Sequence, residues 1–184
     1  MSLKAALLVL AIAWNGVVFS EKVDTTDFDS EVTVAVRNLS GLNCITESVL
    51  DLEDAAAEFK FQINKKCSQS AGADLATQLK DARVLIKQTT ELLNINDNDC
   101  DNAAFDEDWD GKRKPSYNCR RNYQKQLTQV YLVNVKATKD IETGLRDTSN
   151  TSLCQKKAMQ SFHSSLINFV NLVSECKTVS EKQK

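Results

Sequence analysis

Apolar residues recur every three or four positions over four long stretches of this chain, and the last stretch, residues 153–176, shows the pattern most regularly. Its apolar positions are Ala158, Phe162, Leu166, Phe169 and Val173. Side chains spaced in this way lie on one face of an α-helix. The stretch therefore predicts an amphipathic helix with one buried face.

Three earlier stretches repeat the pattern. They cover residues 28–66, 75–94 and 123–145. In the first of them, Val32, Val34 and Val36 also alternate as in a β-strand, and Gly41 is of a residue type that kinks or ends helices. The spacing of three to four continues on both sides of these positions, so we expect one long helix here.

Short polar segments join the first helix to the second and the third to the fourth. Residues 68–73 contain Gly72, and residues 147–151 are rich in the residue types that cap helix N-termini. Short connections favour antiparallel neighbours. The sequence predicts an all-α fold, namely a four-helix up-down bundle of two antiparallel helical hairpins, followed by a polar tail from residue 177.

The N-terminal segment has the pattern of a secretory signal peptide. Lys4 is basic, residues 5–14 are an unbroken apolar run, and the residues up to Ser20 are tolerated at a cleavage position. The apolar run is far shorter than the ~20 residues that span a bilayer. We expect residues 1–20 to be removed, which leaves a single exported domain, residues 21–184, without a membrane span.

The charge of the chain argues against some partners. The sequence has 23 basic and 25 acidic residues, and removal of Lys4 with the signal peptide leaves 22 basic residues against 25 acidic, a net charge of −3. Nucleic acids and anionic membranes select basic surfaces. We therefore expect neither as the main partner.

All six cysteines lie after the signal peptide, and the oxidising export route favours three disulfides among them. They are Cys44, Cys67, Cys100, Cys119, Cys154 and Cys176. Zinc is a poor alternative, because no two cysteines have the spacing of a metal knuckle and the chain has one histidine.

Helix geometry favours one pairing of these cysteines. Cys44 and Cys67 lie 23 positions apart in the first helix, and Cys154 and Cys176 lie 22 apart in the last. If Cys67 bonds Cys154 between antiparallel helices, Cys44 and Cys176 lie level, and the other two cysteines close the long connection. One detail conflicts, because Cys44 and Cys67 lie about 140° apart around a regular helix. Cys67 must lie beyond the helix end, or the helix must kink; spacing alone leaves other pairings open.

No arrangement of residues typical of an enzyme is visible. His163 is the only histidine, and Ser161, Ser164 and Ser165 lie on its own helix, where near neighbours do not face one another. The cysteines are expected to be oxidised, and the chain lacks a Gly-rich phosphate loop and an HExxH motif. The sequence predicts no catalytic residue, no cofactor and no enzyme activity.

The long connection between the second and third helices, residues 95–116, is polar, acidic and irregular. Connections of this length are usually functional or disordered. Trp109, the only tryptophan after the signal peptide, lies between acids, as aromatic residues at partner contacts do; the alternative is that it packs on the rim of the bundle. The candidate interaction residues are Asp97, Asp99, Asp101, Asp106, Glu107, Asp108, Trp109 and Asp110.

Part of this connection resembles a calcium-binding loop. Asp97, Asp99, Asp101 and Asp108 match positions 1, 3, 5 and 12 of an EF-hand. However, Asn102 replaces the glycine that the turn requires, and an aspartate is a short substitute for the bidentate glutamate. We expect no metal site and a solvated acidic loop whose charge is balanced by the basic residues that follow it.

Two sequons predict N-glycosylation, at Asn38 and at Asn150. Asn150 lies in a predicted turn and is expected to be accessible. Asn38 lies within a predicted helix, where a glycan is harder to place.

The signal peptide, the single helical domain and the six scattered cysteines together resemble the TsetseEP-domain family of small secreted insect proteins. The resemblance covers most of the mature chain and implies a protein of gut or secretory fluid without established chemistry. We expect a secreted, non-catalytic interaction module that binds an extracellular protein. The alternative is a carrier that holds a small apolar ligand between its helices.

Overall fold

A computed structural model describes residues 23–67, 73–103, 114–147 and 149–182. These residues form five α-helices and one π-helical turn, and no strand occurs among them. The elements are α1 (Thr26–Ala35), α2 (Leu39–Phe61), the π-turn η1 (Gln62–Lys66), α3 (Ala76–Asn98), α4 (Tyr117–Arg146) and α5 (Leu153–Glu181). The all-α prediction is confirmed, whereas the predicted count of four helices is not. The expected signal peptide lies outside the described residues.

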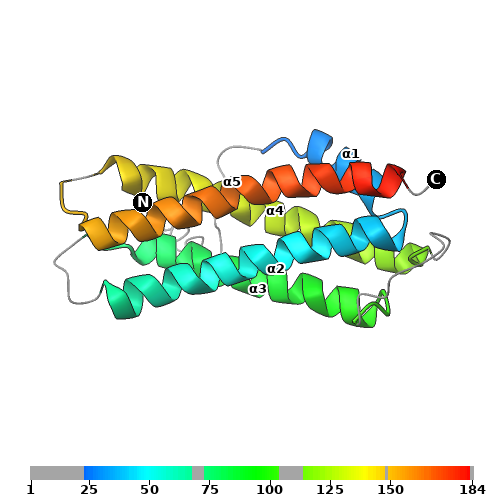
Figure 1. Cartoon of the computed structure of the whole chain (residues 1–184), viewed down its shortest axis with the longest axis horizontal. Helices are drawn as coiled ribbons and strands as arrows, with labels where there is room; N and C mark the ends of the chain where they lie inside the picture. Colours follow the sequence, from blue (N-terminus) through cyan, green and yellow to red (C-terminus); the bar gives the residue numbers. More distant parts are fainter. Residues whose placement is uncertain (1–22, 68–72, 104–113, 148, 183–184) are drawn as a thin grey trace, which may run out of the picture.

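The four long helices α2 to α5 lie side by side, and each runs antiparallel to the one before it (Figure 1). Contacts join α2 to α3, α3 to α4, α4 to α5 and α5 back to α2, so the four helices enclose one core. Helix α1 is an addition to this arrangement. It packs against α5 and α4 rather than continuing the line of α2 (Figure 1).

The expected first helix is broken before Gly41, at residues 36–38. Asn38 ends the continuity because it caps α2: its side-chain oxygen accepts a hydrogen bond from the backbone N–H of Gly41 at 3.0 Å. Asparagine is among the most favourable N-cap residues. The Asn38 amide nitrogen donates to the backbone oxygen of Ser180 on α5 at 2.9 Å. Because the Asn38 side chain caps α2 and also binds α5, it fixes the position of the break between α1 and α2.

Gly41 allows the close packing at this break. A Cβ atom added to Gly41 would lie 2.0 Å from the backbone oxygen of Ala35 and 2.9 Å from the Cβ of Ser180. Real Cβ atoms do not approach backbone atoms so closely. The chain therefore needs a glycine where α1, α2 and α5 meet.

Replacing Gly41 by alanine is expected to lower the free energy of unfolding by about 1–3 kcal/mol, the usual cost of overpacking a close contact. The reason is that backbone atoms of Ala35, not a flexible side chain, have to move. Gly144→Ala is the matched control, since its added Cβ would meet the flexible ends of Gln78 and Met159 at 3.1 Å. The control should be neutral or gain up to about 1 kcal/mol from helix propensity. Urea denaturation of both variants checks this, and equal effects would contradict it.

The structure also moves two predicted boundaries. Helix α3 continues to Asn98 instead of ending near residue 94, which shortens the long connection. Helix α5 continues to Glu181, so most of the predicted polar tail is helical. Ser180 in this last turn is buried, and its hydroxyl donates to the backbone oxygen of Val34 at 3.1 Å. The contact with α1 therefore extends α5 beyond Cys176.

All six cysteines are paired, as Cys44–Cys176, Cys67–Cys154 and Cys100–Cys119. This is the pairing that the helix geometry favours. The conflict over the direction of Cys67 is resolved by η1: the backbone N–H of Cys67 bonds the oxygen of Gln62, five residues earlier, and Cys67 follows the last helical residue. The wider turn and the position beyond the helix end together bring Cys67 to α5.

Aromatic residues connect the helices of the core. The rings of Phe59 on α2 and Phe162 on α5 stack with centroids 4.7 Å apart, and both residues are buried. Phe28 of α1 stacks on Tyr131 of α4 at 4.1 Å, which anchors the added helix. None of the described helices is long and apolar enough to cross a membrane.

Candidate interaction site

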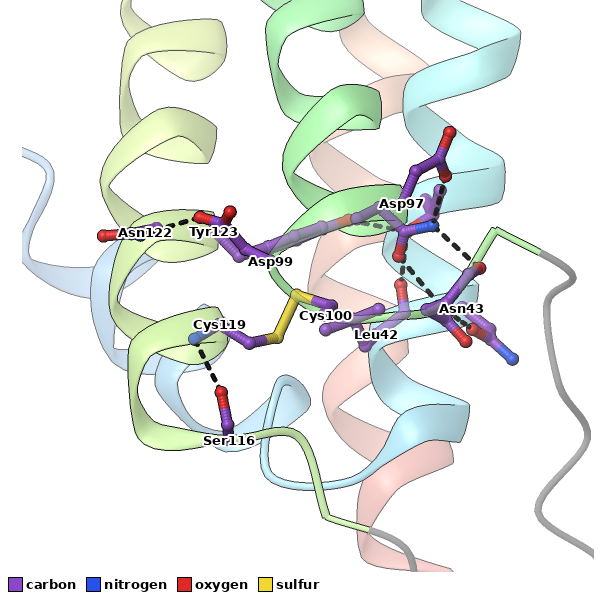
Figure 2. Close-up of a disulfide and its surroundings, with 12 residues drawn as sticks. Leu42, Asn43, Asp97, Asp99, Cys100, Ser116, Cys119, Asn122 and Tyr123 are labelled. Carbon is purple, nitrogen blue, oxygen red and sulfur yellow. Dashed lines mark hydrogen bonds between the residues drawn. A yellow bond between two sulfur atoms is a disulfide. The ribbon is translucent and has the colours of Figure 1, made fainter.

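The acidic connection is fastened at both ends to the bundle. The Cys100–Cys119 disulfide joins the second residue after α3 to the first turn of α4, with Cα atoms 4.8 Å apart (Figure 2). Ser116 caps α4 by accepting a hydrogen bond from the backbone N–H of Cys119 at 3.1 Å. The first and last described parts of the connection are thus held next to one another.

Asn102 anchors the start of the connection. It is fully buried, and its amide nitrogen donates to the side-chain oxygens of Asn43 at 2.7 Å and Asn96 at 2.9 Å. Asn96 in turn donates from its amide to the backbone oxygen of Asn102 at 3.1 Å. Asp101, which directly precedes Asn102, has a backbone φ angle of 51°. This left-handed conformation lets the chain turn back onto α3. These bonds hold the first residues after α3 in one conformation.

The polar contacts continue into the core. The hydroxyl groups of Thr46 and Tyr123 lie 2.8 Å apart, and Thr46 also lies 3.4 Å from the side-chain oxygen of Asn96. All three residues are buried, and burial raises the pKa of Tyr123 far above its usual value, so its hydroxyl stays protonated. We call the buried residues Thr46, Asn96, Asn102 and Tyr123, together with the half-buried Asn43, the buried polar network.

Three of the predicted interaction residues lie on the solvent side of this network. Asp97, Asp99 and Asp101 are all exposed, and Asp99 accepts a hydrogen bond from Asn122 on α4 at 2.8 Å (Figure 2). The other five, Asp106, Glu107, Asp108, Trp109 and Asp110, lie outside the described residues. The three carboxylates at the start of the acidic connection therefore lie on the protein surface.

The arrangement differs from a calcium loop where it can be compared. Asp97 belongs to helix α3, and Asp99 is its C-cap, so the first two frame positions do not lie in a loop. In the described part of the chain no group of three or more His, Cys, Asp or Glu side chains is placed to hold a metal ion.

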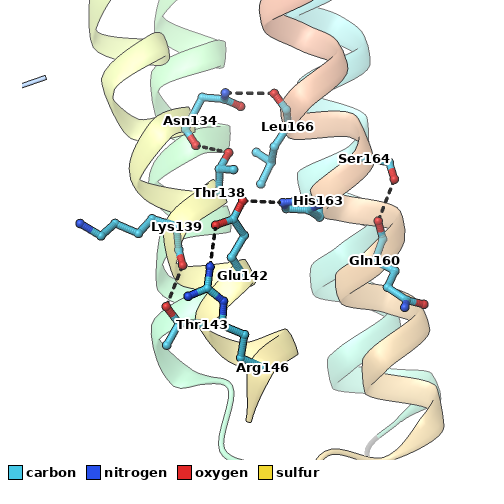
Figure 3. A network of polar contacts seen from close by, with 10 residues as sticks. All are labelled: Asn134, Thr138, Lys139, Glu142, Thr143, Arg146, Gln160, His163, Ser164 and Leu166. Carbon is cyan, nitrogen blue, oxygen red and sulfur yellow. Dashed lines mark hydrogen bonds and ion pairs between the residues drawn. The ribbon is translucent and has the colours of Figure 1, made fainter. Parts of the chain in front are cut away.

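His163 is part of a surface contact between α4 and α5. Its Nε2 lies 3.2 Å from Oε1 of Glu142, and the other carboxylate oxygen of Glu142, Oε2, lies 3.7 Å from a guanidinium nitrogen of Arg146 (Figure 3). The hydroxyls of Ser164 and Ser165 donate to backbone oxygens one turn earlier on the same helix. None of these bonds joins a serine to His163, so the group connects two helices.

The two sequons differ in accessibility. Asn150 is exposed in the turn before α5. Asn38 is buried, and the nitrogen that would carry a glycan donates to Ser180. In the folded protein the Asn38 amide nitrogen is thus engaged in packing, whereas that of Asn150 lies at the surface; glycosylation of both residues stays a prediction.

Sequence reasoning missed a partly buried charge cluster on the other half of the bundle, in which Asp81 is the buried member. Lys136 on α4 lies 2.6 Å from carboxylate oxygens of both Asp81 on α3 and Asp140 on α4. Asp81 is 4% exposed, and burial together with the neighbouring Asp140 raises the pKa of its carboxyl to about 6. The i,i+4 spacing of Lys136 and Asp140 was the one available signal, but nothing in the sequence brings Asp81 to them.

The seam between α2 and α5 carries an open depression with a cavity volume of about 320 Å³. It is lined by Ser48, Asp51, Leu52, Ser165, Asn168, Phe169 and Leu172. Phe169 and Leu52 are themselves buried, so they form its floor. The depression is a surface feature with an apolar base and polar sides.

Comparison with known proteins gives no relative. No family model matches the chain, no curated protein matches its sequence and no solved structure matches its fold. Functional conclusions therefore rest on the residues and contacts described above.

Proposed function

We propose that this protein is a secreted, non-catalytic interaction module of extracellular fluid, with the features of the TsetseEP-domain family, and that it binds a partner protein through the acidic connection after α3. The surface used would be the end of the bundle that carries Asp97, Asp99 and Asp101. Three disulfides and the lack of a membrane-spanning helix among the described residues are compatible with an extracellular protein.

The buried polar network is the observation that supports this proposal. Burying amides and hydroxyls is unfavourable unless every group is bonded, so an apolar cluster would serve stability alone at least as well. Here the amide nitrogen and the backbone oxygen of Asn102 are bonded and hold the base of the acidic connection in place, while the buried side-chain oxygen of Asn102 has no partner. A preorganised base lowers the entropy that a binding surface loses when its partner arrives.

The acidic side chains at this base present carboxylates at the surface, where a partner can contact them. Asp97 and Asp99 are exposed, and repulsion between like charges on neighbouring residues is screened by salt only beyond about 8–10 Å. A partner with a basic surface would relieve that repulsion. Charge complementarity of this kind sets association rate and partner choice.

The double variant Asp97→Asn, Asp99→Asn is expected to weaken partner capture by at least about fivefold, since two charges at an interface rim contribute roughly 0.5 kcal/mol each. The measurement is a quantitative pull-down from the secreted fluid with the mature protein, whose N-terminal sequence should begin near Glu21. Asp54→Asn, Asp147→Asn is the control, because both acids are exposed and lie away from the connection. Equal capture by wild type and both variants would refute the acidic connection as the binding surface.

Carriage of a small apolar ligand is the second candidate, and the depression between α2 and α5 is the observation that favours it. Its volume of about 320 Å³ lies at the lower end of ligand-binding pockets, and Leu52, Phe169 and Leu172 give it apolar surface. Native mass spectrometry of the same secreted preparation distinguishes the two functions. A mass increase from a bound lipid, with no partner captured, would favour the carrier.

A further inference from the structure

Three arginines surround one surface depression between α1 and α4. Arg37 follows α1, while Arg120 and Arg121 lie near the start of α4. The depression has a cavity volume of about 260 Å³. Its lining, which we call the arginine pocket, consists of Thr33, Val36, Arg37, Tyr117, Arg120, Arg121 and Gln124 and contains no acidic residue.

The three guanidinium groups have no carboxylate partner in the described structure. No Asp or Glu oxygen among the described residues lies within 4.0 Å of Arg37, Arg120 or Arg121. The Nε atom of Arg120 is buried and has no hydrogen-bond acceptor. An arginine carries five N–H donors and is always charged, so a buried donor without an acceptor is unfavourable. An acceptor supplied by a ligand would remove this cost.

The position of these arginines opposes the dipole of α4. The N-terminal end of a helix carries partial positive charge, which favours acidic neighbours and disfavours basic ones. The first turn of α4 contains no acidic residue, whereas Arg120 and Arg121 are its fourth and fifth residues. The chain as a whole has a net charge of −2, so this local excess of positive charge is opposite in sign to the overall charge. It also does not stabilise the N-terminal end of α4. Conflicts of this kind are typical of binding sites.

The walls of the pocket are held in place by contacts that do not use the arginines. Gln124 on α4 donates to the hydroxyl of Thr33 on α1 at 3.1 Å, which joins the two sides. Val36 is fully buried beneath them. Tyr117 is 69% exposed at the edge, so the opening is not closed by it. The arginine pocket is therefore a concave site with fixed walls, and its guanidinium groups have no carboxylate partner among the described residues.

From these observations we propose that the arginine pocket binds a tetrahedral oxyanion, namely the phosphate or sulfate group of a monoester. The planar guanidinium fork matches two oxygens of such a group, and several forks converging on one concavity can satisfy three or more oxygens together. The helix end adds a favourable field for the same anion. This site uses neither the acidic connection nor the α2–α5 seam, so it stands or falls independently of the proposed function.

The test follows the Nε–Hε signals of the arginines by NMR while the full mature protein is titrated with inorganic phosphate, inorganic sulfate or acetate at constant ionic strength. The Arg120 signal is expected to shift saturably with phosphate or sulfate, while the signal of Arg83, an exposed arginine on α3, shifts only weakly and linearly. Saturation by phosphate alone would assign a phosphate ester, and saturation by sulfate alone a sulfate ester.

Two variants separate binding from folding. Arg37→Gln, Arg121→Gln removes two exposed charges and should weaken oxyanion binding about tenfold or more with an unchanged circular dichroism spectrum, since a lost charge-assisted hydrogen bond is worth at least that factor. Arg83→Gln is the control and should bind like wild type. A linear response of Arg120 to both oxyanions, an equally saturable response to acetate, or unchanged affinity in the double variant would overturn the proposal.

Discussion

Removing the Cys44–Cys176 disulfide, by Cys44→Ala and Cys176→Ala, is expected to lower the free energy of unfolding by about 4 kcal/mol. The bond closes a sequence separation of 132 residues, but Cys67–Cys154 lies inside that loop and stays intact. The unfolded chain therefore gains the freedom of only the two segments between the bonds, 23 and 22 positions long. A loop of about 45 residues corresponds to about 4 kcal/mol in the chain-entropy model, against about 5 kcal/mol for the full separation.

The nesting itself is testable with a double-mutant cycle. When Cys67→Ala and Cys154→Ala are already present, removal of Cys44–Cys176 should cost about 1 kcal/mol more than it does in the wild type, because the whole separation is then released. Guanidinium denaturation of the four proteins measures this difference. Strict additivity of the two disulfides would contradict the nested arrangement of the loops.

Replacing Lys136 by methionine is expected to lower the free energy of unfolding by about 3 kcal/mol at pH 7.5. The substitution leaves the carboxylates of Asp81 and Asp140 next to one another without a cation, and an uncompensated buried charge typically costs 3–5 kcal/mol. The lower end applies because the Lys136 side chain is 32% exposed. Lys125→Met, on an exposed position of the same helix, is the control and should stay within about 0.5 kcal/mol of wild type.

The cost of Lys136→Met should depend on pH in a definite direction. The pKa of Asp81 is raised to about 6 in the folded protein, above its ordinary value of 3.8, so its favourable contribution exists at low pH and is lost as the pH rises through 6. Without Lys136 the pKa of this carboxyl rises further, and the loss becomes larger. The variant should therefore be about 3 kcal/mol less stable than wild type at pH 7.5 but only about 1 kcal/mol less stable at pH 4.5.

Urea denaturation at both pH values checks this expectation. Because the comparison is between variant and wild type at each pH, the contributions of all other titrating groups cancel to first order. A cost that is the same at pH 4.5 and pH 7.5 would show that Asp81 does not exchange its proton with folding in this range.

The helices and the disulfides follow from local rules, which is why the sequence predicts them. Side chains three and four positions apart share a helix face whatever the rest of the chain does, and Phe162, Leu166 and Phe169 are indeed buried together. Two helices with cysteines 22 and 23 positions apart act as rods of equal length. One bond between antiparallel rods therefore brings the other pair level, as Cys44 and Cys176 show.

The break between α1 and α2 depends on a residue far away in the sequence. The sequence shows an uninterrupted helical spacing through Val36, and Gly41 is the position that looks like a break. The actual break is stabilised by Asn38, whose partner Ser180 lies 142 positions later on α5. No local pattern contains that bond, because it exists only when α5 is already packed against α1.

The candidate interaction site likewise depends on residues that lie far apart in the sequence. Asp97 and Asp99 were visible in the sequence as acids, but the network that holds their base depends on Asn43, Asn96 and Asn102, which come from two helices and the connection. Amides of this kind look like ordinary surface residues until their partners are placed.

The sequence by itself therefore determined the all-α class and favoured the disulfide pairs, since both depend on periodicity along single helices. Only the tertiary structure decided the number of helices, the contact of the buried Asp81 with Lys136 and the convergence of Arg37 with Arg120 and Arg121. The physical reason is that the free energy of a buried polar or charged group depends on the groups that other elements bring within hydrogen-bonding distance. That distance is set by packing, not by position along the chain.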